Sequence, residues 1–362
     1  MRIGLIAPPW LPVPPAAYGG TELVLDVLAR GLAKAGHDVL LVTTGDSTCP
    51  VRRSWAYDRA RTAEIGNTTV EVRHLIHAYS AVRDMDIVHD HTVVGPVVAA
   101  ARDARNVVTT NHGPFTADVT EIYRSIGARI PLIAISHHQA STSGGVPTAR
   151  VIHHGLDVAR YPVGAGTGGY ALFLGRMSPS KGVTTAIQVA RRAGLPLIIA
   201  AKMQEPAERE YFDSDVAPML GRDVSYIGEV GGSEKLSLLG NAVALLNPIL
   251  WDEPFGLCMI EALACGTPVV ATCRGSVPEI VDHTYTGFVC SSVDELAKAM
   301  AQAGALDRRA CRAAVEARFS MEEMARNHIA LYEDVVSAVS GEGALGGGPA
   351  KRGRPVPSAS FL

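Results

Sequence analysis

The sequence predicts an α/β fold of two halves, each with a parallel sheet covered by helices on both faces. Short apolar runs alternate with helical segments as far as residue 160, stop at the glycine-rich stretch 161–169, and then begin again. The length of 362 residues fits two domains of about 150 residues or more. We therefore expect a cleft between the halves, at the carboxyl ends of the strands, where parallel sheets bind ligands.

Composition and charge exclude several classes of protein. The chain has 33 basic and 36 acidic residues, a net charge of −3, and 47% hydrophobic residues. It is therefore neither a disordered polyelectrolyte nor a nucleic-acid binder with a basic surface. Its six cysteines form no Cys-x-x-Cys pair, so we expect reduced, buried thiols rather than a zinc site or disulfides.

The sequence favours a cytoplasmic protein. No uninterrupted apolar run reaches the length of a membrane span, and the apolar start is too short for a signal peptide. Peripheral contact with a membrane surface stays open.

In the first half, a buried strand is expected over residues 2–7. A helix is expected over 21–34, because its leucines and valines fall on one stripe, and Gly36 ends it as a C-cap glycine. Further strands are expected over residues 38–44, 87–89, 106–109 and 132–135.

The second half repeats this alternation and leads to a closing helix. Strands are expected over 170–175, 197–201, 224–227, 243–247 and 268–272, and helices over 182–193 and 256–265. We expect an N-terminal domain over 1–163 and a C-terminal domain over 164–320. A helix over 321–340 then packs back on the first domain, and the glycine-rich residues 341–362 form a disordered tail.

Two segments at the expected cleft suit a phosphate-containing ligand. Gly19 and Gly20 precede the first helix, where backbone approaches a ligand closely and the helix N-terminus favours an anion. A tight turn explains the same pair equally well. Arg176 and Lys181 follow the first strand of the second half, and two cations there suit a diphosphate leaving group. An ordinary basic loop is the alternative.

The segment 251–268, with the sequence WDEPFGLCMIEALACGTP, carries the strongest signal. Pro254 suits a first helical position. Glu253 and Glu261 lie about two helical turns apart, and a carboxylate at Glu261 can accept hydrogen bonds from two ribose hydroxyls. The N–H groups expected to be free to hold a phosphate belong to Phe255, Gly256 and Leu257.

These motifs resemble those of the retaining glycosyltransferases of family 4, nucleotide-sugar enzymes with the GT-B fold of two facing Rossmann-like domains. Glu253 and Glu261 match the family's Glu-x7-Glu pattern, and the other motifs follow in family order over about residues 1–335. These motifs are GGTE at 19–22, DIVHDH at 86–91, NHG at 111–113, HGLD at 154–157, GRMSPSKG at 175–182 and SVPEIVDHTYTGFV at 276–289.

The resemblance implies an enzyme that transfers a sugar, with retained configuration, from a nucleotide-diphosphate donor to a hydroxyl of a small molecule or glycan. A UDP-sugar is favoured over a GDP- or ADP-sugar, and no further cofactor is expected. The implied catalytic residues are His112, Arg176, Lys181 and Glu253. The implied donor-binding residues are Gly19, Gly20, Arg176, Lys181, Ile227, Gly228, Phe255, Gly256, Leu257 and Glu261. Glu279 is expected close to the phosphate-binding helix, and His154, where the family often has Asn, is expected to be structural.

Two alternatives to this function stay open. A disaccharide phosphorylase of the same architecture would use the same cationic pocket, and a non-catalytic protein would only bind a sugar or nucleotide. The presence of all four residues Glu253, Glu261, Arg176 and Lys181 argues against the non-catalytic protein. The content of Ala, Gly and Arg is compatible with antibiotic or oligosaccharide biosynthesis.

The Asp-x-Asp triplets at 84–86 and 213–215 are not expected to bind a metal. The first triplet precedes a strand, at the end of the sheet away from the cleft, and the second lies in a polar segment expected to be an exposed loop. The cations and the helix N-terminus already supply the positive field that a metal would provide.

Overall fold

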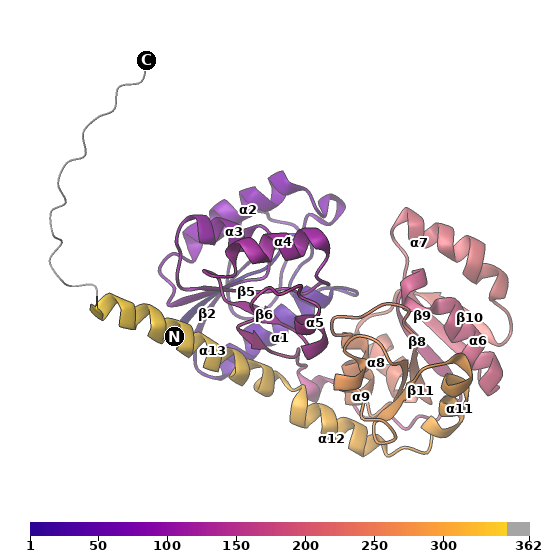
Figure 1. Ribbon diagram of the computed structural model, residues 1–362. Helices are drawn as coiled ribbons and strands as arrows, with labels where there is room; N and C mark the ends of the chain where they lie inside the picture. Colours follow the sequence, from indigo (N-terminus) through magenta and orange to yellow (C-terminus); the bar gives the residue numbers. More distant parts are fainter. Residues whose placement is uncertain (346–362) are drawn as a thin grey trace, which may run out of the picture.

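The structure is a computed structural model that describes residues 1–345. Two α/β domains lie side by side, and the last helix, α13 (Met321–Leu345), runs along the N-terminal domain (Figure 1). Each domain contains one sheet whose strand pairs are all parallel. The predicted fold of two parallel sheets covered by helices is confirmed.

The N-terminal sheet has seven strands in the order β3-β2-β1-β4-β5-β6-β7. Their bounds are Arg2–Ile6 (β1), Asp38–Thr43 (β2), Arg52–Trp55 (β3), Ile87–Asp90 (β4), Val107–Thr110 (β5), Leu132–Ala134 (β6) and Arg150–Val151 (β7). The α-helices of this domain are Gly20–Lys34 (α1), Thr68–Ala81 (α2), Gly95–Ala101 (α3), Ala117–Ile126 (α4) and His137–Ser141 (α5).

The C-terminal sheet has six strands in the order β10-β9-β8-β11-β12-β13. Their bounds are Ala171–Arg176 (β8), Leu197–Lys202 (β9), Val224–Gly228 (β10), Ala244–Asn247 (β11), Val269–Thr272 (β12) and Gly287–Cys290 (β13). The α-helices are Val183–Ala193 (α6), Pro206–Tyr211 (α7), Gly232–Asn241 (α8), Leu257–Ala264 (α9), Val277–Ile280 (α10), Val293–Ala303 (α11) and Arg308–Arg318 (α12).

The strand order places the switch point of each sheet beside its first strand. In the first sheet β1 lies between β2 and β4, and in the second β8 lies between β9 and β11. Connections on the two sides of such a strand run in opposite directions and leave a crevice at the carboxyl ends of the strands. The loops that follow β1, β8 and β11 are therefore available to form a ligand site.

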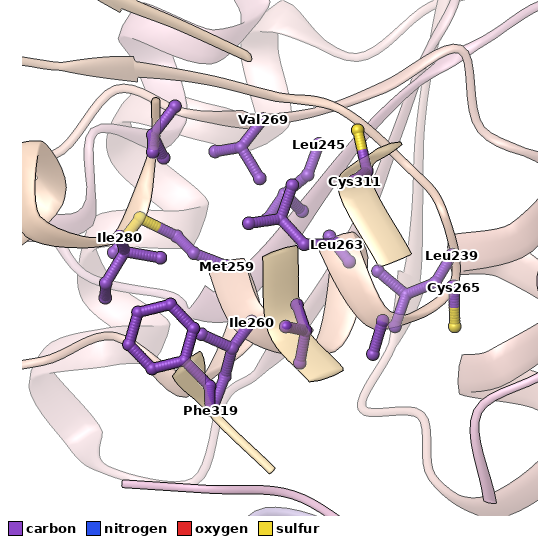
Figure 2. Close-up of a cluster of buried hydrophobic side chains, with 14 of the residues drawn as sticks. Leu239, Leu245, Met259, Ile260, Leu263, Cys265, Val269, Ile280, Cys311 and Phe319 are labelled. Atoms are coloured by element: carbon purple, nitrogen blue, oxygen red, sulfur yellow. The ribbon is translucent and has the colours of Figure 1, made fainter. Parts of the chain in front are cut away.

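The core of the C-terminal domain anchors α9. Figure 2 shows Met259, Ile260 and Leu263 of this helix among Leu245 of β11 and Phe319, which follows α12, all within one cluster of buried side chains. All of these side chains are almost inaccessible to solvent. The N-terminus of α9 is thus held on a rigid core while it faces the other domain.

Helix α13 packs closely on α1. A Cβ atom built on Gly31 of α1 would lie 2.9 Å from Cβ of Ala325, a distance that packed side chains do not adopt. Glycine at this position therefore lets the two helices approach. Met324 and Tyr332 of α13 are buried in the same core as Leu28 of α1.

The glycine-rich linker, residues 161–169, is hydrogen-bonded to the C-terminal domain. Nε of Arg308 donates to the carbonyl of Gly164 at 2.8 Å, and its Nη2 donates to the carbonyl of Gly240 at 2.9 Å. The N–H of Gly166 also donates to the Gly240 carbonyl at 3.0 Å. One side chain thus joins the linker to the end of α8.

Several predicted bounds were wrong. Helix α13 extends to Leu345, beyond the predicted end at residue 340, so Gly341 does not stop it. The remaining tail, 346–362, lies outside the described residues. The triplet at 213–215 was expected in a loop but lies in a π-helical turn, Phe212–Val216, that continues directly from α7.

Candidate active site

A pocket of about 370 Å³ lies between the two domains and is lined by both. This volume falls within the usual range for small-molecule sites, about 300–1,000 Å³. The N-terminal domain contributes the loop after β1 with the start of α1, and the loop after β5. The C-terminal domain contributes the ends of β8, β9 and β11, the segment after β10, and the start of α9.

Gly19 and Gly20 line the pocket at the start of α1. A Cβ atom on Gly19 would lie 2.7 Å from Cβ of Pro15, so the loop cannot fold this way with a larger residue. A Cβ atom on Gly20 would lie 3.4 Å from Cδ1 of Leu257, which belongs to the other domain. The predicted glycine pair therefore lies where the two domains meet.

His112 lines the pocket and forms a hydrogen bond to a second histidine. Its Nε2 lies 2.8 Å from Nδ1 of His91, and its ring stacks at 5.3 Å on that of His154, which also lines the pocket. Burial lowers the pKa of His112 to about 4, and burial lowers the pKa of His91 well below its usual range. Both rings are therefore neutral at pH 7.

The surroundings of His91 determine which nitrogen of His112 carries the proton. Nε2 of His91 is buried and has no hydrogen-bond partner among the described residues. A buried N–H without an acceptor costs more free energy than an unpaired acceptor. The proton of His91 therefore sits on Nδ1 and is donated to Nε2 of His112, which leaves the proton of His112 on its Nδ1.

Lys181, Glu253 and Trp251 form one cluster on the pocket wall. The ammonium of Lys181 forms an ion pair with the carboxylate of Glu253 and lies 5.1 Å from the centroid of the Trp251 ring. Nε1 of Trp251 donates to Oε2 of Glu253 at 3.0 Å. Burial alone would lower the pKa of Lys181, but the charge of Glu253 outweighs it and raises that pKa, so the ammonium stays charged.

Glu261 lies on α9 and forms a second ion pair in the pocket. Its Oε1 accepts hydrogen bonds from Nζ of Lys235 at 2.6 Å and from the hydroxyl of Tyr161 at 3.1 Å. Only 6% of the Glu261 side chain is exposed. Two lysine–glutamate pairs thus flank the N-terminal half of α9.

The start of α9 faces the pocket as predicted from the sequence. Phe255, Gly256 and Leu257 all line it, and Gly256 has a φ of 86°, a conformation that strains other residues. The helix begins at Leu257, so its first N–H groups have no partner within the helix. Hydrogen bonding to an anion is the chemistry that this position offers.

Arg176, Ile227 and Gly228 are not brought to the pocket wall. Nε of Arg176 donates to Oε1 of Glu208 at 2.8 Å, and its Nη2 donates to Oε1 of Glu205 at 2.7 Å. These two carboxylates, at the N-cap and in the first turn of α7, hold the guanidinium.

Beyond β10 the wall is formed by the two residues that follow Ile227 and Gly228. These are Glu229 and Val230. The register of β10 shifts between Tyr226 and Gly228, an irregularity that a sequence pattern does not reveal.

Three charged residues of the pocket were missed by the sequence reasoning: Lys202, Glu229 and Lys235. Lys202 ends β9, and its ammonium lies 5.2 Å from the centroid of the Tyr18 ring in the other domain. Oε1 of Glu229 accepts the N–H of Tyr18 at 2.9 Å. The positions of Lys202 and Glu229, at or just after the carboxyl ends of β9 and β10, were the available signal, whereas Lys235 lies within α8.

Glu279 connects the two domains. From α10 it accepts the N–H groups of His137 and His138, at 2.8 and 2.7 Å, at the start of α5 in the N-terminal domain. Nε2 of His153 lies 2.8 Å from the same carboxylate. Burial would raise the pKa of Glu279, but these hydrogen bonds outweigh it and lower the pKa. Glu279 does not line the pocket. Its partner His153 lies 5.8 Å, ring to ring, from Phe255, which closely precedes α9.

The acidic triplets do not approach the pocket. Asp86 forms an ion pair with Arg2 at 2.7 Å, and both Asp213 and Asp215 are exposed. Residues 1–345 contain no group of three or more His, Cys, Asp or Glu side chains placed to hold a metal ion. In the same range, no helix is long and apolar enough to cross a membrane.

Comparison with known protein families covers both domains. Residues 18–160 match Glycosyltransferase Family 4, and residues 164–321 match Glycosyl transferases group 1. The chain belongs to this family of glycosyltransferases. Enzymatic sugar transfer, predicted from the sequence, is therefore confirmed.

Similar proteins extend the match to nearly the whole chain. The glycogen synthase of Mycobacterium tuberculosis is 28% identical, covering 81% of this chain and 84% of that protein. The structure of a glycosyltransferase involved in avilamycin A biosynthesis is 27% identical, with a TM-score of 0.72, covering 93% of this chain and 98% of its own. The structure of HepE from Anabaena, in complex with UDP and glucose, is 18% identical, with a TM-score of 0.72, covering 92% and 100%. The GT-B fold of this glycosyltransferase is thereby confirmed.

Proposed function

We propose that this glycosyltransferase moves a sugar from a UDP-sugar to an acceptor hydroxyl, with retention of the anomeric configuration. The observation that carries the proposal is the pocket between the domains. It combines the ammonium of Lys181, the start of α9 and the buried carboxylate of Glu261 on one wall, with His112 on the other.

The ribose, the phosphate and the sugar of a UDP-sugar each have a suitable partner in this pocket. Glu261 is placed to accept hydrogen bonds from ribose hydroxyls, and the first N–H groups of α9 are placed to bind phosphate. Glu253, beside Lys181, would bind hydroxyls of the sugar. UDP is favoured because HepE, which has the same fold, binds it. No further cofactor belongs to the proposal.

Bond cleavage in the proposed reaction places negative charge on the departing diphosphate. The bond between the anomeric carbon and the phosphate oxygen breaks, and Lys181 with the N–H groups of α9 stabilises the charge that develops. One such preorganised contact is typically worth about 3–4 kcal/mol of barrier. The new bond forms between the anomeric carbon and the acceptor oxygen, and the acceptor proton passes to the departing diphosphate.

Retention is proposed from the resemblance to the retaining glycosyltransferases of family 4, and we infer a route without a covalent intermediate because no carboxylate of the pocket is free to form one. Among the described residues the carboxylates on the wall are Glu229, Glu253 and Glu261, and each is engaged by hydrogen bonds or an ion pair. The acceptor would then attack from the face that the diphosphate leaves. The Nδ1–H of His112 would donate to a hydroxyl of the transferred sugar and hold it during this exchange.

The acceptor would bind on the side of the N-terminal domain, beside Tyr18. Antibiotic or oligosaccharide biosynthesis is the setting we favour, because a relative of similar length is involved in avilamycin A biosynthesis. We place the protein in the cytoplasm, since its six cysteines are all free and four of them are buried.

A donor panel tests this proposal. UDP-, GDP- and ADP-sugars are incubated with the enzyme and a mixture of oligosaccharide acceptors, and the released nucleotide is measured. The consumption of free phosphate is measured in parallel. We expect release of UDP, and NMR of the product should show the anomeric configuration of the donor. Consumption of phosphate with a disaccharide, without nucleotide release, would indicate the phosphorylase instead. An inverted product would contradict retention.

A further inference from the structure

The carboxylate of Glu261 bonds to the protein through one oxygen and leaves the other to the pocket. Its Oε1 accepts hydrogen bonds from Lys235 and Tyr161, at 2.6 and 3.1 Å. Its Oε2 has no hydrogen-bond partner among residues 1–345 and does not belong to their buried polar atoms without one, so it is open to the pocket that Glu261 lines. Because a carboxylate oxygen is a hydrogen-bond acceptor, Oε2 is available to donors of a ligand.

The two donors to Oε1 differ in what they can fix. The ammonium of Lys235 is a charge at the end of a flexible chain, with three rotatable donors, so it neutralises the carboxylate without setting its direction. The hydroxyl of Tyr161 sits on a rigid ring and donates a single proton. The terminal torsion of a glutamate is soft, so a rigid second donor on Oε1 determines which way Oε2 points.

Tyr161 is itself held firmly. It is only 8% exposed, and its side chain belongs to the same cluster of buried side chains as Ile260 of α9. Its N–H donates to the carbonyl of Val158 at 3.1 Å, and its own carbonyl accepts from Nη1 of Arg312. The phenol therefore has a fixed position relative to α9, the helix that carries the carboxylate.

The hydroxyl of Tyr161 serves this one contact. Burial, and then the charge of Glu261, holds the pKa of Tyr161 well above its usual value, so the hydroxyl is protonated at pH 7 and donates. Among the described residues, Glu261 is the only hydrogen-bond partner of this hydroxyl. A phenylalanine would fill the same space, so packing alone does not account for the tyrosine.

We propose that Tyr161 is a positioning residue for the donor, whose hydroxyl fixes Glu261 so that Oε2 receives hydrogen bonds from the ribose hydroxyls. This inference rests on the proposed function, because it takes a nucleotide diphosphate with an intact ribose as the ligand. Lys235 neutralises the carboxylate, and Tyr161 orients it. The site then selects ribose over a sugar that lacks these hydroxyls, since an acceptor built to receive a hydrogen bond is left unpaired by the latter.

Calorimetric titration of the full chain tests the inference with UDP and 2′,3′-dideoxy-UDP, which differ only in the two ribose hydroxyls. The variants are Tyr161→Phe and a matched control, Tyr285→Phe, which removes the hydroxyl of a tyrosine that is 58% exposed. The wild type should bind UDP more tightly than 2′,3′-dideoxy-UDP. Tyr161→Phe should weaken UDP binding about three- to tenfold, the strength of one net hydrogen bond, and leave the binding of 2′,3′-dideoxy-UDP unchanged. Tyr285→Phe should bind both probes as the wild type does.

Two results would overturn the inference while the proposed function stands. If Tyr161→Phe binds UDP as tightly as the wild type, the hydroxyl does not orient Glu261. If it weakens the binding of both probes equally, Tyr161 only supports the packing of the pocket. A wild-type protein that binds UDP no more tightly than 2′,3′-dideoxy-UDP would overturn the ribose role of Glu261 together with the inference, and one that binds no UDP would overturn the proposed donor.

Discussion

At the scale of single residues, the pocket is built from pairs in which one side chain determines the state of another. Lys181 stays charged because Glu253 lies beside it, and His112 keeps its proton on Nδ1 because His91 donates to its Nε2. Trp251 contacts both members of the first pair. The chemistry therefore depends on partners that no single motif reveals.

Glu261→Gln tests the ribose role. The substitution keeps the shape of the side chain but removes the charge that Lys235 pairs with and that ribose hydroxyls would contact. We expect the KM for the UDP-sugar to rise about tenfold with kcat little changed, since a hydrogen bond to a charged group is lost. The control is Glu210→Gln, an exposed position. An unchanged KM would contradict the ribose assignment.

Acid should destabilise the folded chain. Burial lowers the pKa of six histidines strongly below the usual value of about 6.5, to about 4 for three of them. The unfolded chain therefore binds more protons than the folded chain below about pH 6.5, and stability falls as the pH is lowered toward 4. The histidines are His74, His89, His91, His112, His154 and His328.

Three carboxyl groups whose pKa is raised by burial act in the opposite direction. Burial raises the pKa of Glu22 to about 7, of Asp90 to about 6, and also that of Glu71. These groups are protonated more readily in the folded chain, so they favour folding as the pH falls. We expect a lower Tm at pH 5 than at pH 7 in a thermal melt. An equal or higher Tm at pH 5 would contradict the net effect.

At the scale of elements, apolar runs predicted the central strands well. The ranges expected for β1, β2, β8, β9, β11 and β12 agree with the structure to within one residue at each end, because these strands are buried and consist mainly of apolar residues. The edge strand β3 has the sequence RRSW, and β7 has only two residues, so neither shows an apolar run. Pairing with a neighbouring strand, not local composition, makes these segments strands.

The candidate site was predictable to a similar extent. Residues on the strand-end loops and on α9 were found because their motifs are local, and Lys181 and Glu261 do line the pocket. The orientation of Arg176 was not predictable, because it depends on Glu205 and Glu208, which lie about 30 residues further along the chain. Tertiary contacts of this kind leave no local pattern.

Arg308 supplies several of the hydrogen bonds between the linker and the C-terminal domain. Arg308→Ala would leave the carbonyls of Gly164 and Ala242 without this donor, and that of Gly240 with only the N–H of Gly166. Loss of this buried bonding should lower the free energy of unfolding by about 2–3 kcal/mol in urea titration. Arg309→Ala, at the exposed neighbouring position, is the control. Equal stability of the two variants would show that the linker is held by other contacts.

At the scale of the whole molecule, the two domains are held together by contacts at two separate places. Glu229 accepts the N–H of Tyr18 on one side, and Glu279 accepts two N–H groups at the start of α5 on another. Both carboxylates belong to the C-terminal domain, and both bind backbone of the N-terminal domain. Such contacts can be broken and remade without disturbing either core, as domain closure requires.

Glu279→Ala tests this connection. Removing the carboxylate leaves the N–H groups of His137 and His138 without an acceptor and removes the partner of His153. The domains should then separate more in the absence of a ligand, and small-angle X-ray scattering should give a larger radius of gyration than for the wild type. Saturating UDP-sugar should reduce the difference. Identical scattering of the variant and the wild type without a ligand would show that Glu279 does not hold the domains together.

The central claim is that glycosyl transfer occurs in the pocket between the domains, with Lys181 stabilising the departing diphosphate. Its most direct test is kcat for nucleotide release by Lys181→Met under saturating UDP-sugar and acceptor, with Lys298→Met as the control. We predict that kcat falls about 100- to 1,000-fold in Lys181→Met, while Lys298→Met retains wild-type turnover. Wild-type kcat in a folded Lys181→Met protein would contradict the claim.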